Sequence, residues 1–231
     1  MKKTISSRKC LIWRLMMNKI LVISPHFDDA VLSAGHHMAG RPDSEVVTVF
    51  GGVPKGANRI HTPYDEKCGF SNAEDAVSSR KHENNLATAM LRATHIDLGF
   101  PDNQYNQDVS EDQIVEQLQD ILDNGDYEYI MAPLGLGHPD HLMTTHVVLR
   151  LKTELPIYLW EDLPLRVIEP ELVQERLKEL NITTSVWNTS TDKEKMADKV
   201  RALSCYTSQI GTGILDPYLL YVPERFYKYE N

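Results

Sequence analysis

Cysteine, long apolar runs and a surplus of basic residues are all missing or scarce in this sequence. The three cysteines, Cys10, Cys68 and Cys205, lie far apart and form no paired spacing. This excludes a disulfide framework and a thiolate zinc site, and it fits the reducing cytoplasm, where we expect the protein to be. No apolar run approaches the ~20 residues that span a bilayer, so the sequence predicts no membrane span.

Acidic residues outnumber basic ones. The chain has 24 lysines and arginines against 33 aspartates and glutamates, which gives a formal net charge of −9 at pH 7. Nucleic acids are held mainly by clustered lysine and arginine, so this charge argues against a nucleic-acid partner. A small molecule is the expected partner, and the sequence leaves open whether the chain forms a homo-oligomer.

The N-terminus is locally basic and carries the short apolar stretch Cys10–Trp13. Arg14 interrupts that stretch and no small-residue cleavage site follows, so we interpret residues 1–17 as a disordered extension. A surface-binding arm and an export signal are the alternatives. The chain has 231 residues, 42% of them hydrophobic, which is enough for residues 18–231 to form a single α/β domain with its own core.

Strand-like and helix-like patterns alternate along the chain. Apolar runs predict strands at 19–24, 45–50, 96–99, 129–132 and 156–160, with a terminal β segment at 219–222 and 226–229. Helical spacing predicts helices at 30–39, 71–94, 112–122, 142–151, 170–180 and 192–206. The second of them is expected to bury Ala76, Leu86, Ala87, Met90 and Leu91. This order is typical of a three-layer α/β fold, with a mostly parallel, Rossmann-like sheet and helices on both faces.

Two short polar segments each follow a predicted strand. The first is Ser24–Asp29, with the sequence Ser-Pro-His-Phe-Asp-Asp, and the second is Gly137–His141, with the sequence Gly-His-Pro-Asp-His. In an open parallel sheet every strand-to-helix loop leaves at the carboxyl edge, where ligands bind. The two segments can therefore converge if their strands are near neighbours, a relation that the sequence leaves open.

The residue types in these segments suit a catalytic metal. A catalytic zinc takes three nitrogen or oxygen ligands and one water, whose pKa it lowers to about 7. His26 and one of Asp28 and Asp29 can supply two ligands, and His138 or His141 the third. The other aspartate can take a proton from the water, and the other histidine can stabilise an oxyanion. A metal-dependent hydrolase is thus the first hypothesis.

The two segments resemble motifs of the LmbE-like N-acetylglucosaminyl-phosphatidylinositol deacetylases, the PIG-L family. That family carries Pro-His-Pro-Asp-Asp-Glu and His-Pro-Asp-His, and here they stand as Pro25–Ala30 and His138–His141. The likeness continues in Arg80–Glu83, Gly99–Asp102 and Ala202–Gln209, so that it covers residues 18 to 210. The resemblance implies the LmbE-like fold and a zinc-dependent enzyme that removes an acyl group, with acetyl expected, from an amino sugar or a sugar-containing conjugate.

The resemblance also implies roles for the residues of the two motifs. The implied zinc ligands are His26, Asp29 and His141. Asp28 would be the general base, and His138 would steady the tetrahedral intermediate. A site of two histidines and one carboxylate can hold zinc or another divalent metal such as Fe²⁺, so the choice of metal stays open.

Three further residues match positions around the family's site. Asp140 would orient a ligating histidine from behind, as such histidines generally require. Arg80 and Asp102 match positions that line the family's substrate pocket. The alternative for Arg80 is an i,i+3 ion pair with Glu83 on the surface of a helix.

Three residues depart from the pattern of the family. Phe27 stands where the first motif has proline, and Ala30 stands where it has glutamate. Neither is an implied ligand, but the missing glutamate removes a carboxylate just behind the site, which bears on metal affinity and substrate preference. Leu136 stands where some relatives have a tyrosine, so an oxyanion donor of those relatives is absent here.

The segment from Gly51 to Asn72 is rich in glycine, proline and asparagine and is too long for a simple connector. It leaves the second predicted strand at the carboxyl edge, beside the proposed metal site. We therefore expect it to cover the pocket and to set substrate specificity. The first candidates for substrate contacts in it are Arg59, His61 and Tyr64.

Other readings compete with the hydrolase. Taken alone, the first segment could reflect an aspartate that only caps a helix. A nucleotide-binding protein is less favoured, because the turn after the first strand lacks Gly-x-Gly-x-x-Gly and carries acidic residues where phosphates need bare N–H groups. A third reading is a non-catalytic sugar- or nucleotide-binding relative with a vestigial metal site. The complete set of implied ligands and base favours the enzyme.

Overall fold

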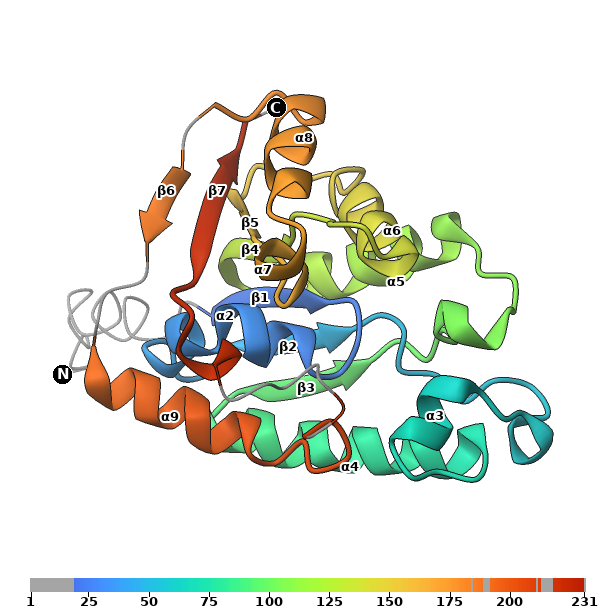
Figure 1. The fold of residues 1–231 in the computed structure, drawn as a ribbon. Helices are drawn as coiled ribbons and strands as arrows, with labels where there is room; N and C mark the ends of the chain where they lie inside the picture. The colour runs from blue at the N-terminus through green and yellow to red at the C-terminus, as the bar shows by residue number, and fades with distance from the viewer. Residues whose placement is uncertain (1–18, 184, 189–191, 211, 213–217, 231) are drawn as a thin grey trace, which may run out of the picture.

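A computed structural model describes residues 19–183, 185–188, 192–210, 212 and 218–230 (Figure 1). The extension predicted at residues 1–17 lies outside the described residues. Within them, a central sheet has helices packed on both faces, as the three-layer prediction requires. No helix of the described part is long and apolar enough to span a membrane.

The described strands form a seven-stranded sheet in the order β3-β2-β1-β4-β5-β7-β6. Their bounds are β1 (Lys19–Ser24), β2 (Glu45–Thr48), β3 (Thr94–Asp97), β4 (Tyr127–Pro133), β5 (Ile157–Trp160), β6 (Ser185–Asn188) and β7 (Arg225–Tyr229). The first five pair in parallel, whereas β7 runs antiparallel to both β5 and β6. The mostly parallel, Rossmann-like sheet is confirmed.

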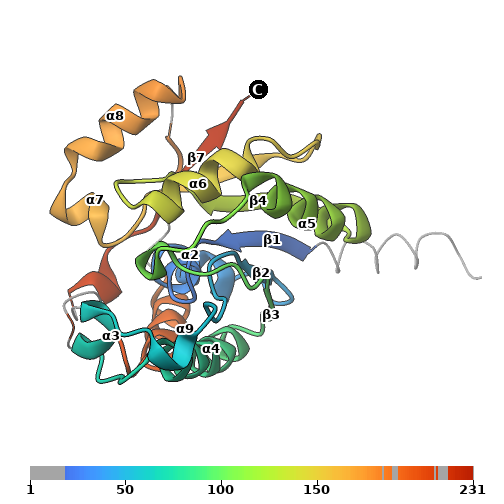
Figure 2. The same cartoon turned by 90° about the vertical axis from the view of Figure 1, so that its right-hand side faces the viewer.

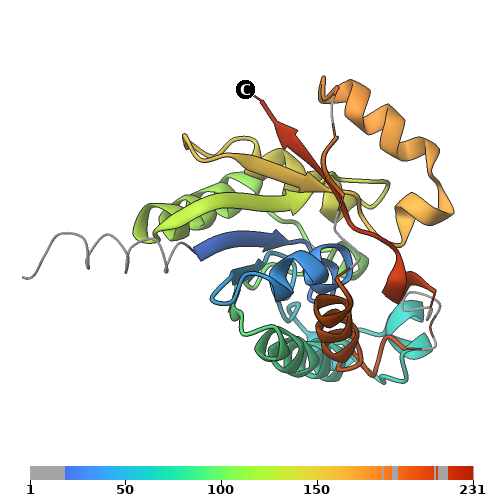
Figure 3. The same cartoon turned by 90° about the vertical axis from the view of Figure 1, so that its left-hand side faces the viewer.

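Helices cover both faces of this sheet (Figures 2 and 3). One face carries α2 (Asp29–Ala39), α4 (Ala73–Met90) and α9 (Lys193–Leu203), and the other carries α5 (Glu111–Asn124), α6 (Pro139–Val148) and α8 (Glu171–Glu179). Along β1, Ile20 and Val22 enter the first core, and Leu21 and Ile23 enter the second. Successive side chains of a strand point to opposite faces, so an uninterrupted apolar run indicates a strand covered on both sides.

The pairing of β1 with β4 brings the two motifs together. In this parallel pair Leu21 lies opposite Ile130 and Val22 opposite Met131. Because the two strands run in the same direction, the loops that follow them leave the same edge of the sheet side by side. The structure thus supplies the neighbour relation that the sequence left open.

The buried face of α4 agrees with the prediction at Ala76, Ala87 and Leu91 but not at Leu86 and Met90. Leu86 and Met90, expected in the core, are 45% and 56% exposed. The buried stripe instead contains Arg80, Glu83 and Asn84, each of which pairs with a polar group of another segment. Polar side chains with partners in other segments therefore lie on the buried face of this helix, and Leu86 and Met90 face solvent.

The C-terminal part also departs from the prediction. Residues 226–229 form a strand as expected, but Leu219–Tyr221 forms a short 3₁₀ helix, η3, instead of a strand. β6 and the four-residue helix α7 (Leu165–Ile168) had no expected counterpart. Both follow irregular stretches in which the apolar residues are too few to show a period.

The segment from Gly51 to Asn72 is more ordered than the predicted loop. It contains a 3₁₀ turn, η1 (Ala57–Arg59), and a short helix, α3 (Pro63–Lys67). The Thr62 side chain caps α3 by accepting the Asp65 N–H at 3.1 Å, and a proline stands in the first turn. Local capping chemistry therefore orders part of this segment close to the carboxyl edge of the sheet.

Gly52 fixes where this segment leaves the sheet, which leads to a prediction. Its N–H donates to the Phe100 carbonyl at 2.8 Å, and a Cβ at this position would lie 2.0 Å from the Gly99 oxygen. We expect Gly52→Ala to lower the free energy of unfolding by about 1–3 kcal/mol, the usual cost of overpacking. Urea unfolding measures this, with Val53→Ala, at a side chain 55% exposed, as the control. Equal unfolding midpoints for both variants would contradict it.

Candidate metal centre and active site

The first motif lies between β1 and α2. Asp28 occupies the N-cap position of α2, but its side chain makes no capping hydrogen bond. Asp29, the first residue of the helix, accepts the His26 N–H at 2.8 Å through Oδ2. Helix capping therefore does not explain why an aspartate stands at position 28. Asp28 is only 7% exposed, so its carboxylate is buried without that role.

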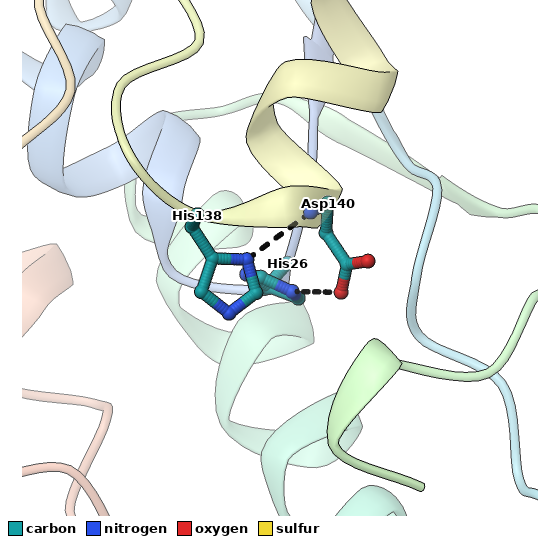
Figure 4. A group of neighbouring side chains, drawn as sticks. All are labelled: His26, His138 and Asp140. Carbon is teal, nitrogen blue, oxygen red and sulfur yellow. Dashed lines mark hydrogen bonds and ion pairs between the residues drawn. The ribbon is translucent and has the colours of Figure 1, made fainter. Parts of the chain in front are cut away.

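The second motif begins α6 and contacts the first (Figure 4). His138 Nδ1 accepts the Asp140 N–H at 3.2 Å, which leaves the ring proton of a neutral His138 on Nε2. Asp140 Oδ2 accepts from His26 Nε2 at 2.9 Å and from the Asn103 N–H at 3.0 Å. Asp140 thus fixes the His26 ring so that Nδ1 is the nitrogen that faces Asp29, and its lone pair becomes free when the imidazole loses its second proton.

His26 Nδ1 faces the imidazole of His141 across the carboxylate of Asp29. Asp29 Oδ2 lies 3.2 Å from His26 Nδ1 and 3.2 Å from His141 Nε2. The potential ligand atoms of these three residues all lie within 4.8 Å of one another. Two imidazole nitrogens and one carboxylate oxygen at this spacing fit a divalent metal such as zinc or iron. The structure brings together the three residues that the sequence implied as ligands.

His141 is held by an aspartate that the sequence reasoning missed. Asp162 Oδ1 accepts from His141 Nδ1 at 2.6 Å, and Asp162 Oδ2 accepts the Gly135 N–H at 3.0 Å. This aspartate is fully buried. A carboxylate behind a ligating histidine fixes its tautomer and orientation. Asp162 follows β5 as Asp28 follows β1, so its place just after a predicted strand was the available signal.

The pKa values of His26, Asp29 and His141 show which charges a bound cation would replace. Burial raises the pKa of Asp29, but His141 and His26 outweigh it and hold that pKa well below its usual range. Burial lowers the pKa of His141, yet Asp29 and Asp162 raise it to about 10. The pKa of His26 is also raised against the effect of burial, chiefly by Asp102. A divalent cation would bring the same charge as the protons on the two imidazoles. Because the ring nitrogens must be free of those protons to act as ligands, metal binding would release them.

Asp28 supplies a second carboxylate beside this group. Burial, and then the charge of Asp29, raise the pKa of Asp28 from its usual value to about 6. A divalent cation held nearby would lower that pKa again, because it favours the charged form. Asp28 can therefore accept a proton near neutral pH, which is what a general base requires.

A pocket of about 660 Å³ opens over the group, and most of the predicted substrate contacts line it. Tyr64, Arg80 and Asp102 are in its wall. Arg59 and His61 are exposed and are not among the lining residues. The polar lining residues from the two motifs are His26, Asp28, Asp29, His138 and His141.

Arg80 and Glu83 do not pair with each other. Arg80 Nη1 lies 2.8 Å from Asp65 Oδ1. Glu83 accepts from Thr207 Oγ1, from the Ser208 N–H and from Ser208 Oγ, each at 2.7 Å. The surface ion pair considered for these two residues is therefore wrong. Both residues instead join α4 to segments that border the pocket.

The three departures from the family motifs are all buried. The Phe27 ring leaves no room for a Cβ at Gly51, which would lie 2.5 Å from Phe27 Cζ. Ala30 packs in the first core and Leu136 in the second. All three positions contribute apolar packing around the site.

The sequence comparisons agree with this geometry. A family model described as GlcNAc-PI de-N-acetylase, PIG-L, matches residues 21–152, which include both motifs. The chain belongs to the PIG-L family. The resemblance inferred from the motifs is thereby confirmed. A comparison with curated proteins finds no match.

Solved structures of similar fold can be superposed on nearly the whole chain. A deacetylase of teicoplanin biosynthesis, solved with teicoplanin, is 25% identical, with 91% of this chain and 97% of that chain covered and a TM-score of 0.76. N,N'-diacetylchitobiose deacetylase from Pyrococcus horikoshii is 15% identical over 99% and 94%, with a TM-score of 0.64. The 4-carboxy-2-hydroxymuconate hydratase GalB from Pseudomonas putida is 17% identical over 93% and 97%, with a TM-score of 0.59. A hydratase on this fold means that the fold alone does not decide the reaction.

The contacts of Glu83 lead to a stability prediction. Glu83 is 7% exposed and accepts three hydrogen bonds. Glu83→Gln removes the negative charge and one acceptor oxygen, so the hydrogen bonds to a carboxylate become weaker neutral ones and Ser208 Oγ must reorient to accept from the NH₂ group. We expect a loss of about 1–3 kcal/mol in the free energy of unfolding. Urea unfolding measures it, and Glu116→Gln, on the exposed face of α5, is the matched control. A similar midpoint for the two variants would show that the bonds to Glu83 contribute little.

Proposed function

We propose that this protein is a metal-dependent hydrolase that removes an acyl group, acetyl in the simplest substrate, from the amine of an amino sugar or a sugar-containing conjugate. The observation that carries the proposal is the convergence of His26, Asp29 and His141 beside Asp28 in one pocket. Membership of a family described as de-N-acetylases supports it, as do two structural neighbours named as deacetylases. The hydratase shares the fold, so the proposal rests on the site.

His26, Asp29 and His141 would hold the metal, for which we propose zinc, with Fe²⁺ as the alternative that the same donors suit. When bound, the ion polarises the amide carbonyl and lowers the pKa of a water molecule. Asp140 and Asp162 accept the second ring N–H of His26 and His141, respectively, and so keep the donor nitrogens aimed at one point.

Asp28 is the proposed general base. It lies in the pocket wall beside the ligand group, where it can take a proton from the attacking water onto a carboxylate oxygen. The same oxygen can then pass the proton to the nitrogen of the departing amine. Burial and the charge of Asp29 raise the pKa of Asp28 to about 6, and a bound cation would lower it, so the carboxylate is ionised near pH 7 and able to accept the proton.

His138 is placed to stabilise negative charge on the amide oxygen. Burial, followed by the neighbouring His26 and His141, lowers its pKa, so the ring is neutral near pH 7. Its Nδ1 accepts a backbone N–H, and Nε2–H is therefore the available donor in the pocket. A neutral donor aimed at the developing oxyanion stabilises the transition state more than the substrate.

The sugar would bind to a group of pocket residues that we call the polar wall, made of Arg80, Asp102, Gln104 and Gln209. Gln104 Oε1 accepts from Thr62 Oγ1 at 2.8 Å, and Gln209 Oε1 accepts from the Tyr64 hydroxyl. These two bonds tie the polar wall to α3, and Arg80 itself belongs to α4. Carboxylate, amide and guanidinium groups of this kind suit the hydroxyls of a sugar.

The test of this function is a panel of N-acylated amino sugars incubated with zinc-loaded protein while free amine is measured. We expect release of amine by the loaded protein and none after chelation. A protein that holds its metal and binds the sugars but releases no amine would instead be a non-catalytic binding protein with a vestigial site.

We predict that the purified protein holds about one divalent metal ion per chain, as three-ligand catalytic sites do. His26→Ala, Asp29→Ala and His141→Ala should each lose it, because two protein donors are too few for tight binding. Metal analysis after dialysis measures the content. Full metal content in all three variants would rule out this ligand set.

The partner of His141 provides a graded comparison for the same measurement. Asp162→Asn keeps all three ligands but replaces the acceptor of the His141 ring proton. We expect metal affinity to fall by about 10- to 100-fold, as is usual when such a partner is lost. Asp112→Asn, on an exposed side chain of α5, is the control that should leave the affinity unchanged.

We predict that Asp28→Asn keeps the metal but loses about 10²–10⁴-fold in kcat, the range that general bases contribute, because an amide cannot accept the proton. Metal content and turnover are measured on the same sample. Loss of the metal with this variant would mean that Asp28 is a ligand, and unchanged turnover would mean that it is not the base.

A further inference from the structure

The pocket has a second wall that differs in character from the polar wall. It consists of Leu163, Pro164, Leu165 and Leu172, which we call the apolar wall. These residues come from the loop after β5 and from α7 and α8, beyond residues 21–152, to which the family model matches. Figure 2 shows α7 and α8 on one side of the carboxyl edge of the sheet, with α3 on the other side. The family motifs therefore do not determine what this wall binds.

The apolar wall touches the start of the second motif. A Cβ at Gly137 would lie 3.3 Å from Leu172 Cδ1 and 3.7 Å from Leu165 Cδ1. Gly137 has a φ of +60° and immediately precedes His138, the proposed oxyanion donor. Both leucines are only half-buried although they line the pocket. An apolar surface therefore stands next to the point where the amide carbonyl would react.

The geometry of an amide assigns its two substituents to the two walls. The nitrogen carries the sugar, whose hydroxyls need the polar wall near α3 and α4. The carbonyl carbon carries the remainder of the acyl group, and this substituent points away from the nitrogen. With the carbonyl between Asp28 and His138, the acyl group therefore extends toward α7 and α8, where Leu165 and Leu172 lie.

We propose that the substrate carries an aliphatic acyl group longer than acetyl, and that this chain lies along the apolar wall. The inference rests on the proposed function and names the class of acyl group that it removes. A volume of about 660 Å³ lies within the range of pockets that hold drug-sized ligands, so there is room for such a chain. An acetyl methyl would leave Leu165 and Leu172 in contact with water, whereas a longer chain would cover them.

The experiment compares N-acetyl-, N-butanoyl-, N-hexanoyl- and N-octanoylglucosamine as substrates of the zinc-loaded protein. Each methylene removed from water should raise kcat/KM by about fourfold until the chain outgrows the wall. We therefore expect N-hexanoylglucosamine to exceed N-acetylglucosamine by at least about tenfold. Calorimetry with the Asp28→Asn variant, which binds without turnover, should show the same order of affinities.

A variant of the apolar wall locates the effect. Leu172→Gln keeps the size of the side chain but makes it polar, and it should lower the ratio of hexanoyl to acetyl kcat/KM by about tenfold. Leu165→Gln is a second variant in case the first does not fold. Ile168→Gln is the matched control, since Ile168 on α7 is 63% exposed and is not among the lining residues. The control should leave the ratio unchanged.

The outcomes separate this inference from the proposed function. If no acylglucosamine is cleaved by the metal-loaded protein, the proposed function itself fails. If N-acetylglucosamine is cleaved and the rate falls with chain length, the function stands and the inference is overturned. If a long alkyl glycoside of N-acetylglucosamine is favoured while longer N-acyl groups are not, the apolar wall binds the aglycone and the inference is likewise overturned.

Discussion

The parallel pairing of β1 with β4 is the constraint on which the site depends. His26 and Asp29 follow one of these strands and His141 follows the other, at positions more than a hundred residues apart in the chain. Their shared direction and direct pairing place both loops side by side at the same edge, within hydrogen-bonding reach of each other. A strand inserted between β1 and β4 would move the imidazoles apart by about 5 Å and leave two incomplete half-sites.

Around the ligand group, Asp29, Asp140 and Asp162 each have an imidazole partner. Asp29 lies between two imidazoles, while Asp140 and Asp162 each accept from the far side of one of them. Unpaired buried charges are costly, and a broken pair costs more than the pair contributes. The contacts that neutralise these carboxylates without a metal also hold the donor nitrogens of His26 and His141 in position to bind a metal. The site is therefore preorganised for a metal, and the imidazole protons supply the positive charge that a cation would supply when bound.

The sequence predicts those parts of the molecule that local pattern determines. The run before His26 and the helix after Asp29 are short-range signals, and the motif residues converge because strand ends share an edge. Asp162 could not be paired with His141, because their contact depends on how β5 lies beside β4. The rotation of α4 was mispredicted at Leu86 for a similar reason, since the partners of its polar stripe lie in distant segments. The apolar wall comes from α7 and α8, whose packing over the pocket no local period indicates.

The strand order has a consequence for the order in which the protein can be completed during synthesis. β7, the last strand in the chain, lies between β5 and β6 and hydrogen bonds to both. Just before it, the buried Glu224 accepts from the His36 N–H at 2.7 Å and from Lys199 at 2.8 Å, so it links α2 to α9. On the ribosome, β5 emerges about 70 residues ahead of its antiparallel partner, and its open edge is available to other chains during that interval. The loops that carry the two motifs can assemble early, but β5 gains its antiparallel partner only when β7 has left the exit tunnel.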